Sequence, residues 1–267
     1  MSHPTAGVGV AWTAALLALG LAYAAGYFKL RRQRQAASPW RAFAFLSGVV
    51  ALWVAVASPL AQADHHRLTA HMLQHLWLMN VAAPLLLVGA PLRTLDALDA
   101  GWVVVLGTGR LRPVFAFLGH PLLCWLAGTS VILVFHLPFV LGRTLASGGW
   151  HAAQHASFLL AGLLFWWPVL QPWPTVARWP RWSLLLYLFL ATLPCDALSA
   201  FLTFCGRVVY PDYLAGPPSS GARALADQQL AGALMWCFVT LAYLLPAVAI
   251  ALELLSPTRT GPDVTAG

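Results

Sequence analysis

The sequence predicts an all-α membrane protein, a seven-transmembrane helix bundle with its N-terminus outside and its C-terminus in the cytoplasm. Of its 267 residues, 60% are hydrophobic and only 9% are charged, whereas a soluble domain has about 25% charged residues. Seven apolar stretches have the length of about 20 residues that crosses a bilayer. A soluble globular protein is therefore excluded. No nucleic-acid partner is expected either, because the basic residues form no face with polar surroundings.

The seven predicted spans form one domain over residues 1–255, followed by a short flexible cytoplasmic tail at 256–267. The first span has no positive segment before it, so it is expected to stay in the protein rather than to be cleaved as a signal peptide. The stretch 101–107 is too short to cross and is expected to lie in an interfacial loop, while 206–227 is expected to be irregular. The spans are about 7–28, 42–61, 68–90, 121–141, 152–170, 182–205 and 228–252.

The placement of basic residues predicts the orientation, because cytoplasmic loops carry an excess of Lys and Arg. With the N-terminus outside, four basic residues face outward: Arg67, Arg143, Arg207 and Arg223. The cytoplasmic segments then hold the other 11 of the 15 basic residues. These are Lys29, Arg31, Arg32, Arg34, Arg41, Arg93, Arg110, Arg112, Arg178, Arg181 and Arg259.

Most histidines fall in the leaflet that this topology makes the outer one. Ionisable residues at such a depth are costly and by default mark a functional site. His71 and His75 are four residues apart, as are His151 and His155, so each pair shares one helical face about 6 Å apart along the axis. Each pair could hold one metal ion or face a shared cavity. The histidines of this leaflet are His65, His66, His71, His75, His136, His151 and His155.

The two pairs occur in the same pattern, H-x-x-Q-H, at residues 71–75 and 151–155. Each lies 12 or 13 residues after a proline, Pro59 or Pro138. Spans 2 and 3 are therefore interpreted as a weak parallel repeat of spans 4 and 5. In the third hairpin, spans 6 and 7, polar residues other than histidine occupy the outer half: Asp196, Asp227, Gln228 and Gln229.

Soft donor atoms favour copper over zinc at this site. Met79 continues the stripe of His71 and His75 by four residues, and imidazole combined with thioether or thiolate suits Cu(I). A zinc protease would need a Glu directly after the first histidine of a pair, where this chain has Met72 and Ala152. No enzymatic activity is expected. Further soft donors that could reach the same leaflet are Met72, Met235, Cys195 and Cys205.

Structural roles are the alternative for each of these residues. The four paired histidines could hydrogen-bond between helices, and His136 could serve the backbone beside Pro138. Asp196 could pair with Arg207 or cap a kink. Asp227 could be only the N-cap of the last span. The methionines and cysteines could simply fill gaps in the packing, and His65 and His66 could be loop residues.

Several of these segments together resemble a known family. They are Ser58-Pro59-Leu60, the 71–75 motif followed by the stretch Ala83 to Leu92, the 151–155 motif followed by Phe165 to Val169, and Asp227 to Gly232 with Met235-Trp236. In this order they resemble the CtaG-type cytochrome c oxidase assembly factors, the family associated with the caa-type oxidase. The resemblance covers roughly residues 40–250.

The resemblance implies a multi-pass protein of the bacterial plasma (inner) membrane that helps to mature a haem-copper oxidase, with copper supply as the usual proposal. The expected partners are oxidase subunits, the lipid bilayer and, as an open question, a periplasmic copper chaperone. The positions that match the family are His71, His75, His151, His155, Asp227 and Gln228; His136, Met79 and Asp196 are added from the residues themselves.

The sequence thus predicts a factor that binds Cu(I) in an outward-facing, histidine-rich chamber between spans 3, 4, 5 and 7. The four paired histidines are the expected ligands, His136 and Met79 are additional ligands during transfer, and Asp227 orients an imidazole. Three alternatives stay open: a haem-handling assembly protein with axial histidines, a metal- or proton-coupled transporter, and a structural scaffold for oxidase subunits.

Overall fold

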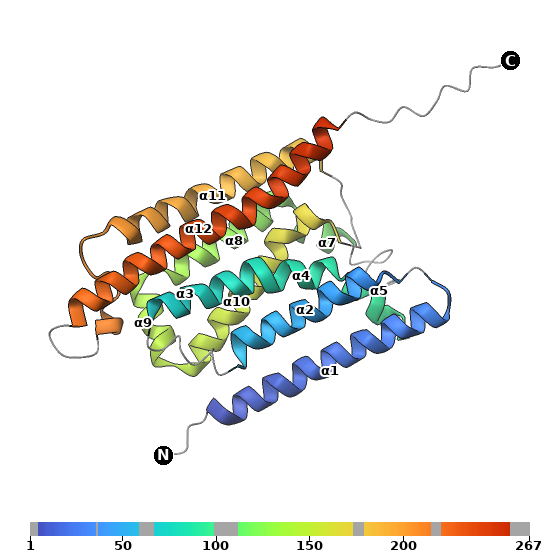
Figure 1. Ribbon diagram of the computed structural model, residues 1–267, viewed down its shortest axis with the longest axis horizontal. Coiled ribbons are helices and arrows are strands. Elements are labelled where there is room, and N and C mark those ends of the chain that lie inside the picture. The colour runs from blue at the N-terminus through green and yellow to red at the C-terminus, as the bar shows by residue number, and fades with distance from the viewer. Residues whose placement is uncertain are drawn as a thin grey trace.

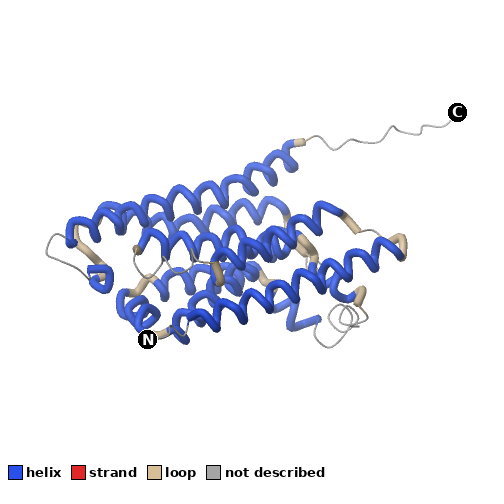
Figure 2. The backbone as a smooth tube through the Cα atoms, turned by 60° about the horizontal axis from the view of Figure 1, so that its bottom comes forward, coloured by secondary structure: helices blue, strands red, loops and turns tan. Residues whose placement is uncertain are grey.

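The fold is a bundle of long helices that lie side by side along one axis (Figure 1). The computed structural model describes residues 5–35, 37–58, 67–98, 112–172, 179–214 and 220–256. Within these ranges the regular structure is entirely helical and contains no strand (Figure 2). The predictions for His65, His66, the stretch 101–107 and the tail beyond Ser256 lie outside the described residues.

Helices of membrane-crossing length alternate with short ones at the two ends of the bundle (Figure 1). Their order is α1 (Thr5–Arg32), α2 (Pro39–Val56), α3 (Leu68–Trp77), the π-helix η2 (Leu78–Ala82), α4 (Ala83–Val88), α5 (Pro91–Asp96), α7 (Arg112–Leu118), α8 (Pro121–Phe135), α9 (Pro138–Ala146), α10 (Gly148–Leu170), α11 (Arg181–Phe204), the 3₁₀ turn η3 (Pro211–Leu214) and α12 (Ser220–Leu255).

Six helices in the described part of the chain are long and apolar enough to cross a membrane, and a bent pair makes a seventh if it counts as one span. The six are α1, α2, the continuous segment from α3 to α4, α10, α11 and α12. The predicted all-α bundle with helices of membrane-crossing length is therefore confirmed. The span through α3, η2 and α4 is the most buried of them, with 61% of its central window inside the bundle.

The fourth predicted span, 121–141, is not continuous. Helix α8 ends at Phe135, and α9 starts at Pro138 after a bend of 75°. Proline has no N–H to continue the helix and favours an extended conformation in the residue before it, and Leu137 is indeed extended, with ψ at 128°. The break lies next to His136, which caps the end of α8.

The last helix begins earlier than predicted. The sequence predicts irregular chain over 206–227, but residues 211–214 form η3 and α12 starts at Ser220. An apolarity scan misses this first part of α12 because Arg223, Asp227 and Gln228 make it polar, although alanine and leucine between them are strong helix formers. Asp227 therefore lies about two turns inside α12, and the alternative that it is only the N-cap of this helix is wrong.

The central span contains a π-helical turn, η2, whose cause is visible in its hydrogen bonds. Pro84 lacks the N–H that would pair with the carbonyl of Asn80 in an α-helix. One residue earlier, the N–H of Ala83 donates to the carbonyl of Leu78, which leaves the carbonyl of Met79 without its usual donor in the helix. The indole Nε1 of Trp166 on α10 donates to this carbonyl at 3.0 Å.

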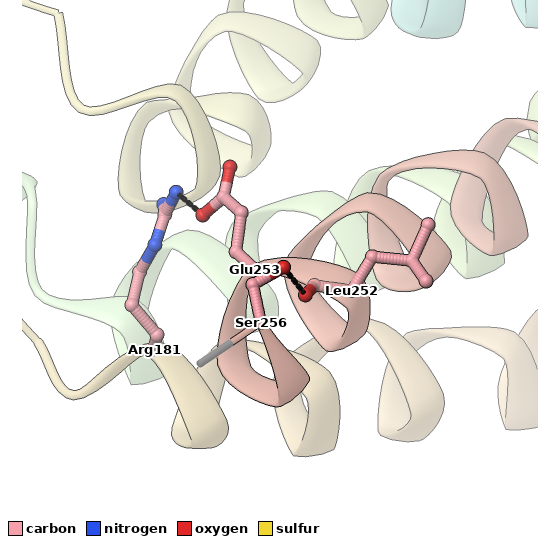
Figure 3. Close-up of polar contacts among 4 residues, drawn as sticks. All are labelled: Arg181, Leu252, Glu253 and Ser256. Carbon is pink, nitrogen blue, oxygen red and sulfur yellow. Dashed lines mark hydrogen bonds and ion pairs between the residues drawn. The ribbon is translucent and has the colours of Figure 1, made fainter. Parts of the chain in front are cut away.

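The two ends of the bundle differ in chemistry. We call the end formed by the starts of α3, α10 and α12, the end of α11, and α9 the histidine end. The opposite end, formed by α5, α7, the end of α1 and the starts of α2 and α11, is the arginine end (Figure 1). At the arginine end, Arg181 of α11 forms an ion pair with Glu253 of α12 (Figure 3).

Candidate functional site

Four histidines from two helices come together near the histidine end. His71 and His151 are each the fourth residue of their helix, α3 and α10, and His75 and His155 follow one turn later. Their ring centroids are 4.3 Å apart for His71 and His75, and 4.2 Å for His151 and His155. Between the helices the distances are 6.1 Å for His71 and His151, and 5.9 Å for His75 and His155. We call this closed quadrilateral the histidine cluster.

The histidine cluster has two tiers along the bundle axis. The tier nearer the histidine end pairs His71 with His151, and the deeper tier pairs His75 with His155. On α3 both rings are buried, with 0% of His71 and 4% of His75 exposed, whereas His151 and His155 are partly exposed. The cluster is therefore closed on the side of α3 and open on the side of α10.

The glutamine of each H-x-x-Q-H motif is buried beside the cluster. The Nε2 atom of Gln154 lies 3.4 Å from Nε2 of His71, across the interface between α10 and α3. Gln74 donates from Nε2 to the carbonyl of Ala55 on α2. The two glutamines therefore have different roles: one contacts an imidazole and the other ties α3 to α2.

An apolar floor separates the histidine cluster from the bundle interior. The ring of Phe158, on α10, stacks on His75 with centroids 4.1 Å apart and an interplanar angle of 12°. Phe135, at the end of α8, contacts Phe158 at 5.7 Å. This packing fixes the plane of the His75 ring while leaving its edge toward the neighbouring helices.

A small cavity lies beyond this floor, between α3, η2, α8, α10, α11 and α12. The space open to the centre of a water molecule is about 20 Å³, which exceeds the roughly 10–15 Å³ that one water needs. The chain has four methionines, one of them Met1, and the other three all line this cavity. We call it the methionine cavity; the residues around it that carry sulfur or imidazole are Met72, Met79, Met235, Cys195, His75 and His136.

His136 is presented to the methionine cavity by the break between α8 and α9. Its Nδ1 lies 2.7 Å from the carbonyl of Ile132, and because a carbonyl can only accept, this nitrogen carries the proton. The other ring nitrogen, Nε2, is buried and has no hydrogen-bond partner among the described residues. This is the arrangement typical of metal-binding histidines, whose second nitrogen donates to a backbone carbonyl.

Met79 lies in η2 and lines the methionine cavity rather than the histidine cluster. The predicted site residue Asp196 and its neighbour Cys195, both on α11, lie in different surroundings. Cys195 is buried and lines the cavity, whereas Asp196 is not among its lining residues. In the described part of the chain no ion pair joins Asp196 to Arg207, and Oδ1 of Asp196 has no hydrogen-bond partner there.

Asp227 holds the beginning of α3 from the neighbouring helix α12. Its Oδ2 accepts from the backbone N–H of Leu68 at 2.7 Å and of Thr69 at 3.4 Å, and its Oδ1 accepts from the hydroxyl of Thr69 at 2.5 Å. The structure thus places Asp227 as an N-terminal cap of α3, one turn before His71. Asp227 therefore orients the helix that carries His71 and His75, whereas the sequence predicted that it orients an imidazole directly.

Gln228 fixes the chain that follows α11. Its Oε1 accepts from the N–H of Val209 at 2.7 Å, and its Nε2 donates to the carbonyl of Arg207 at 3.1 Å. In the same segment, the hydroxyl of Tyr210 donates to the carbonyl of His136 at 3.0 Å. Burial raises the pKa of this phenol, so it stays a donor. Gln228 therefore acts on the site indirectly, through the backbone at the end of α8.

Sequence reasoning assigned no role to Asn80, which also lines the methionine cavity. Its Oδ1 is buried and accepts no hydrogen bond from the described residues. An amide in the middle of a membrane span is itself a signal for a functional position. It was missed because the i, i+4 stripe of His71, His75 and Met79 passes beside it, and the π-helical turn that brings it to the same cavity has no simple sequence signature.

The donor atoms do not surround one point. Among the described residues, no group of three or more His, Cys, Asp or Glu side chains forms a metal site as it stands. The histidine cluster is instead a set of adjacent rings, and the methionine cavity adds the thioether sulfurs of Met72, Met79 and Met235. Of the four clustered histidines, His75 alone borders the methionine cavity, so His75 connects the two.

Comparison with known proteins gives relatives over nearly the whole chain. An uncharacterized protein of Mycobacterium leprae is 28% identical over 256 residues, which is 89% of this chain and 37% of that protein. Uncharacterized proteins of Mycobacterium bovis and Mycobacterium tuberculosis are 29% identical over 252 residues, again 89% and 37%. The chain thus spans little more than a third of the length of these relatives. No solved structure matches it significantly.

A family model gives the assignment. The model of the cytochrome c oxidase caa3 assembly factors, Caa3_CtaG, matches residues 21–256. This range includes the histidine cluster, every residue named at the methionine cavity, and the capping residue Asp227. The chain therefore belongs to the Caa3_CtaG family of cytochrome c oxidase caa3 assembly factors.

Proposed function

We propose that this protein binds Cu(I) at the histidine cluster and delivers it to a haem-copper oxidase subunit during oxidase assembly. The observation that carries the proposal is the quadrilateral of His71, His75, His151 and His155, two of which are buried within an apolar bundle. Copper is the cargo in this proposal, and the oxidase subunit is its acceptor. Membership of the oxidase assembly factor family supports the oxidase as the acceptor, whereas copper as the cargo rests on the chemistry of the ligands.

The spacing of the rings supports one ion held by all four imidazoles. With metal–nitrogen bonds of about 2.0 Å, ring centroids around a tetrahedral ion are about 5 Å apart. The observed distances lie on both sides of this value, at 4.2 and 4.3 Å within each helix and 5.9 and 6.1 Å between the helices. Ring rotations and a small approach of α3 to α10 would bring the nitrogens to one point.

Burial supports the neutral imidazole that a metal requires. Transferring a charged group out of water into an apolar interior is costly, so the buried rings of His71 and His75 favour the uncharged form, which has a lone pair for a metal. A monovalent ion then adds a single positive charge to the site. This combination favours Cu(I) over divalent ions, which carry twice the charge into the same apolar surroundings.

The size of the methionine cavity disfavours the haem alternative. A cavity of about 20 Å³ has room for one water-sized group, and ligand pockets for large organic molecules are at least ten times larger. A porphyrin between the facing histidines would also have to displace the side chains that pack against them, Gln154 at His71 and Phe158 at His75. A Soret absorption band in the purified protein would contradict the copper proposal.

Metal analysis after anaerobic reconstitution with Cu(I) tests the site directly. The double variant His71→Ala/His155→Ala removes one ring from each helix and each tier, and we expect it to bind about one copper ion fewer per chain than the wild type. His120→Ala is the matched control, because His120 lies at the arginine end, where it contacts Trp179, and this variant should bind as the wild type does. Unchanged stoichiometry in the double variant would overturn the site assignment.

Oxidase activity in cells separates delivery from a scaffold role. Alanine at all four clustered histidines should abolish maturation of the oxidase if the protein delivers copper. A scaffold that acts through its surface would instead leave oxidase activity intact. Equal amounts of the variant and the wild-type protein in the membrane, measured by immunoblot, are required for the comparison.

A further inference from the structure

We infer that the methionine cavity is a second, sulfur-rich Cu(I) site, which receives the ion from the histidine cluster through His75. The inference rests on the proposed function for the identity of the ion. It adds a second binding position about two helical turns deeper than the cluster's outer tier, with a different donor set. The ion would thus move inward along α3 from nitrogen ligands to sulfur ligands.

The donor atoms around the cavity are those that Cu(I) prefers. Thioether, thiolate and imidazole ligands select Cu(I) over harder ions. The cavity is lined by three thioethers, from Met72, Met79 and Met235, and by the thiol of Cys195. These residues come from α3, η2, α11 and α12, so the fold gathers every methionine of the chain other than Met1 at one place.

Two imidazoles point to a ligand in this cavity. His75 and His136 both line it, with only 4% and 8% of their surface exposed. The Nε2 atom of each is buried and has no hydrogen-bond partner among the described residues. An unpaired buried polar atom costs about 1–3 kcal/mol, and a bound cation at the cavity would provide the missing partner for both nitrogens.

The cavity has the size of a single ion or water molecule. Its volume of about 20 Å³ suits one small cation and excludes an organic ligand. Asn80 adds a carbonyl oxygen, Oδ1, that also accepts no hydrogen bond from the described residues. Because this amide and Met79 lie on the π-helical turn, the local widening of the helix turns two neighbouring residues toward one space.

His75 gives a physical route between the two positions. It belongs to the histidine cluster, 4.3 Å from His71 and 5.9 Å from His155, and it also borders the methionine cavity. A neutral imidazole has one lone pair, so His75 can ligate one ion at a time, and when both positions are filled the cluster holds its ion by the other three imidazoles. His75 can therefore exchange an ion between the positions by ligand substitution, with no change in the oxidation state of copper.

The test combines copper stoichiometry with X-ray absorption of the full chain loaded anaerobically with Cu(I). Methionine and leucine have similar volumes, and such exchanges in a core usually cost less than about 1.5 kcal/mol, so Met79→Leu/Met235→Leu should fold. We expect the wild type to bind two ions and to show copper–sulfur scattering at about 2.3 Å. The methionine variant should bind one ion fewer and lose most of the sulfur signal.

Control variants separate this inference from the proposed function. Cys237→Ser removes an exposed cysteine that does not line the cavity and should leave stoichiometry and spectrum unchanged. His71→Ala/His155→Ala should lose one ion but keep the sulfur signal. If the methionine variant equals the wild type in both measurements, the second site is wrong and the histidine site stands. If the histidine variant alone equals the wild type, the proposed function is wrong.

Discussion

The carboxylate of Asp227 connects two helices that are 159 residues apart in the chain. A helix N-terminus has unpaired N–H groups and a partial positive charge, and Asp227 satisfies the first two of these groups in α3 from a position inside α12. The residue that precedes α3, Arg67, makes no side-chain capping bond of its own. The register of His71 and His75 therefore depends on a side chain from another span.

Replacing Asp227 by alanine should destabilise the protein through α3. Removal of a helix cap costs about 1–2 kcal/mol, so we expect a lower midpoint of thermal unfolding in detergent. The control is Glu253→Gln, which breaks the Arg181–Glu253 pair, whose side chains are 43% and 57% exposed (Figure 3). An exposed pair contributes less than about 1 kcal/mol. Equal unfolding midpoints of the two variants would contradict the capping role.

At the residue scale, helical spacing predicted which histidines share a face but not what they face. The i, i+4 spacing places His71 with His75 and His151 with His155 without any structure. The contact between the pairs, and the separation of Met79 from them, depend on the rotation of each helix about its axis. Asp227 was predicted near the site because its position matches the family, whereas the hydrogen bonds that it forms depend on the position of α12 against α3.

The π-helical turn η2 packs unusually close to α10. A Cβ atom added to Gly162 would lie 2.8 Å from the carbonyl oxygen of Met79 and 2.9 Å from the Cβ of Ala83. Only glycine permits this approach, and the approach brings the indole of Trp166 to the freed carbonyl of Met79 at 3.0 Å. Gly162 and Trp166 therefore hold the π turn, and with it Met79 and Asn80, against the methionine cavity.

The variant Gly162→Ala should separate α10 from η2. Alanine in a helix is favoured over glycine by about 1 kcal/mol, but the overpacking here costs about 1–3 kcal/mol, so we expect a lower unfolding midpoint and a weaker copper–sulfur signal. Gly148→Ala is the matched control, since no atom lies within 4 Å of an added Cβ there. An unfolding midpoint for Gly162→Ala at or above that of Gly148→Ala would show that α10 and η2 accommodate the added methyl group with no loss of stability.

At the element scale, apolar length predicted the spans well because the bilayer imposes it. The break in the fourth span was not predicted, although Pro138 is visible in the sequence, because proline is tolerated inside several other spans: Pro168 in α10, Pro194 in α11 and Pro246 in α12. Whether a proline bends or ends a helix depends on whether neighbouring residues form hydrogen bonds with the backbone groups that the proline leaves unpaired. At the break, the hydroxyl of Tyr210 donates to the backbone carbonyl of His136. Tyr210 lies 74 residues away in the chain, so the sequence around Pro138 does not reveal this partner.

Over the whole molecule, the basic residues separate along the bundle axis. The arginine end carries Lys29, Arg31, Arg32, Arg34, Arg41, Arg93, Arg112 and Arg181, whereas the histidine end carries Arg67, Arg143, Arg207 and Arg223. The first residues of α1 and the last of α12 lie at opposite ends (Figure 1). The positive-inside rule then predicts that the histidine end faces outward, which is the orientation that the proposed copper delivery needs.

Cysteine labelling tests this orientation. Arg223→Cys at the histidine end and Arg93→Cys at the arginine end both replace exposed residues. A membrane-impermeant maleimide should label Arg223→Cys in intact cells and Arg93→Cys only after the membrane is opened. The wild type provides the background from its four native cysteines. The reverse pattern would place the histidine cluster in the cytoplasmic leaflet and contradict the predicted topology.

The break between α8 and α9 has a consequence for the lipid around the protein. The 15 residues of α8 span about 22 Å, less than the hydrocarbon thickness of about 30 Å, and α9 turns away by 75°. Apolar side chains at the break, Leu137 and Phe139, are exposed. The bilayer must become thinner beside this corner, and such hydrophobic mismatch carries an elastic cost. A partner helix packed against α8 at this corner would relieve this elastic cost.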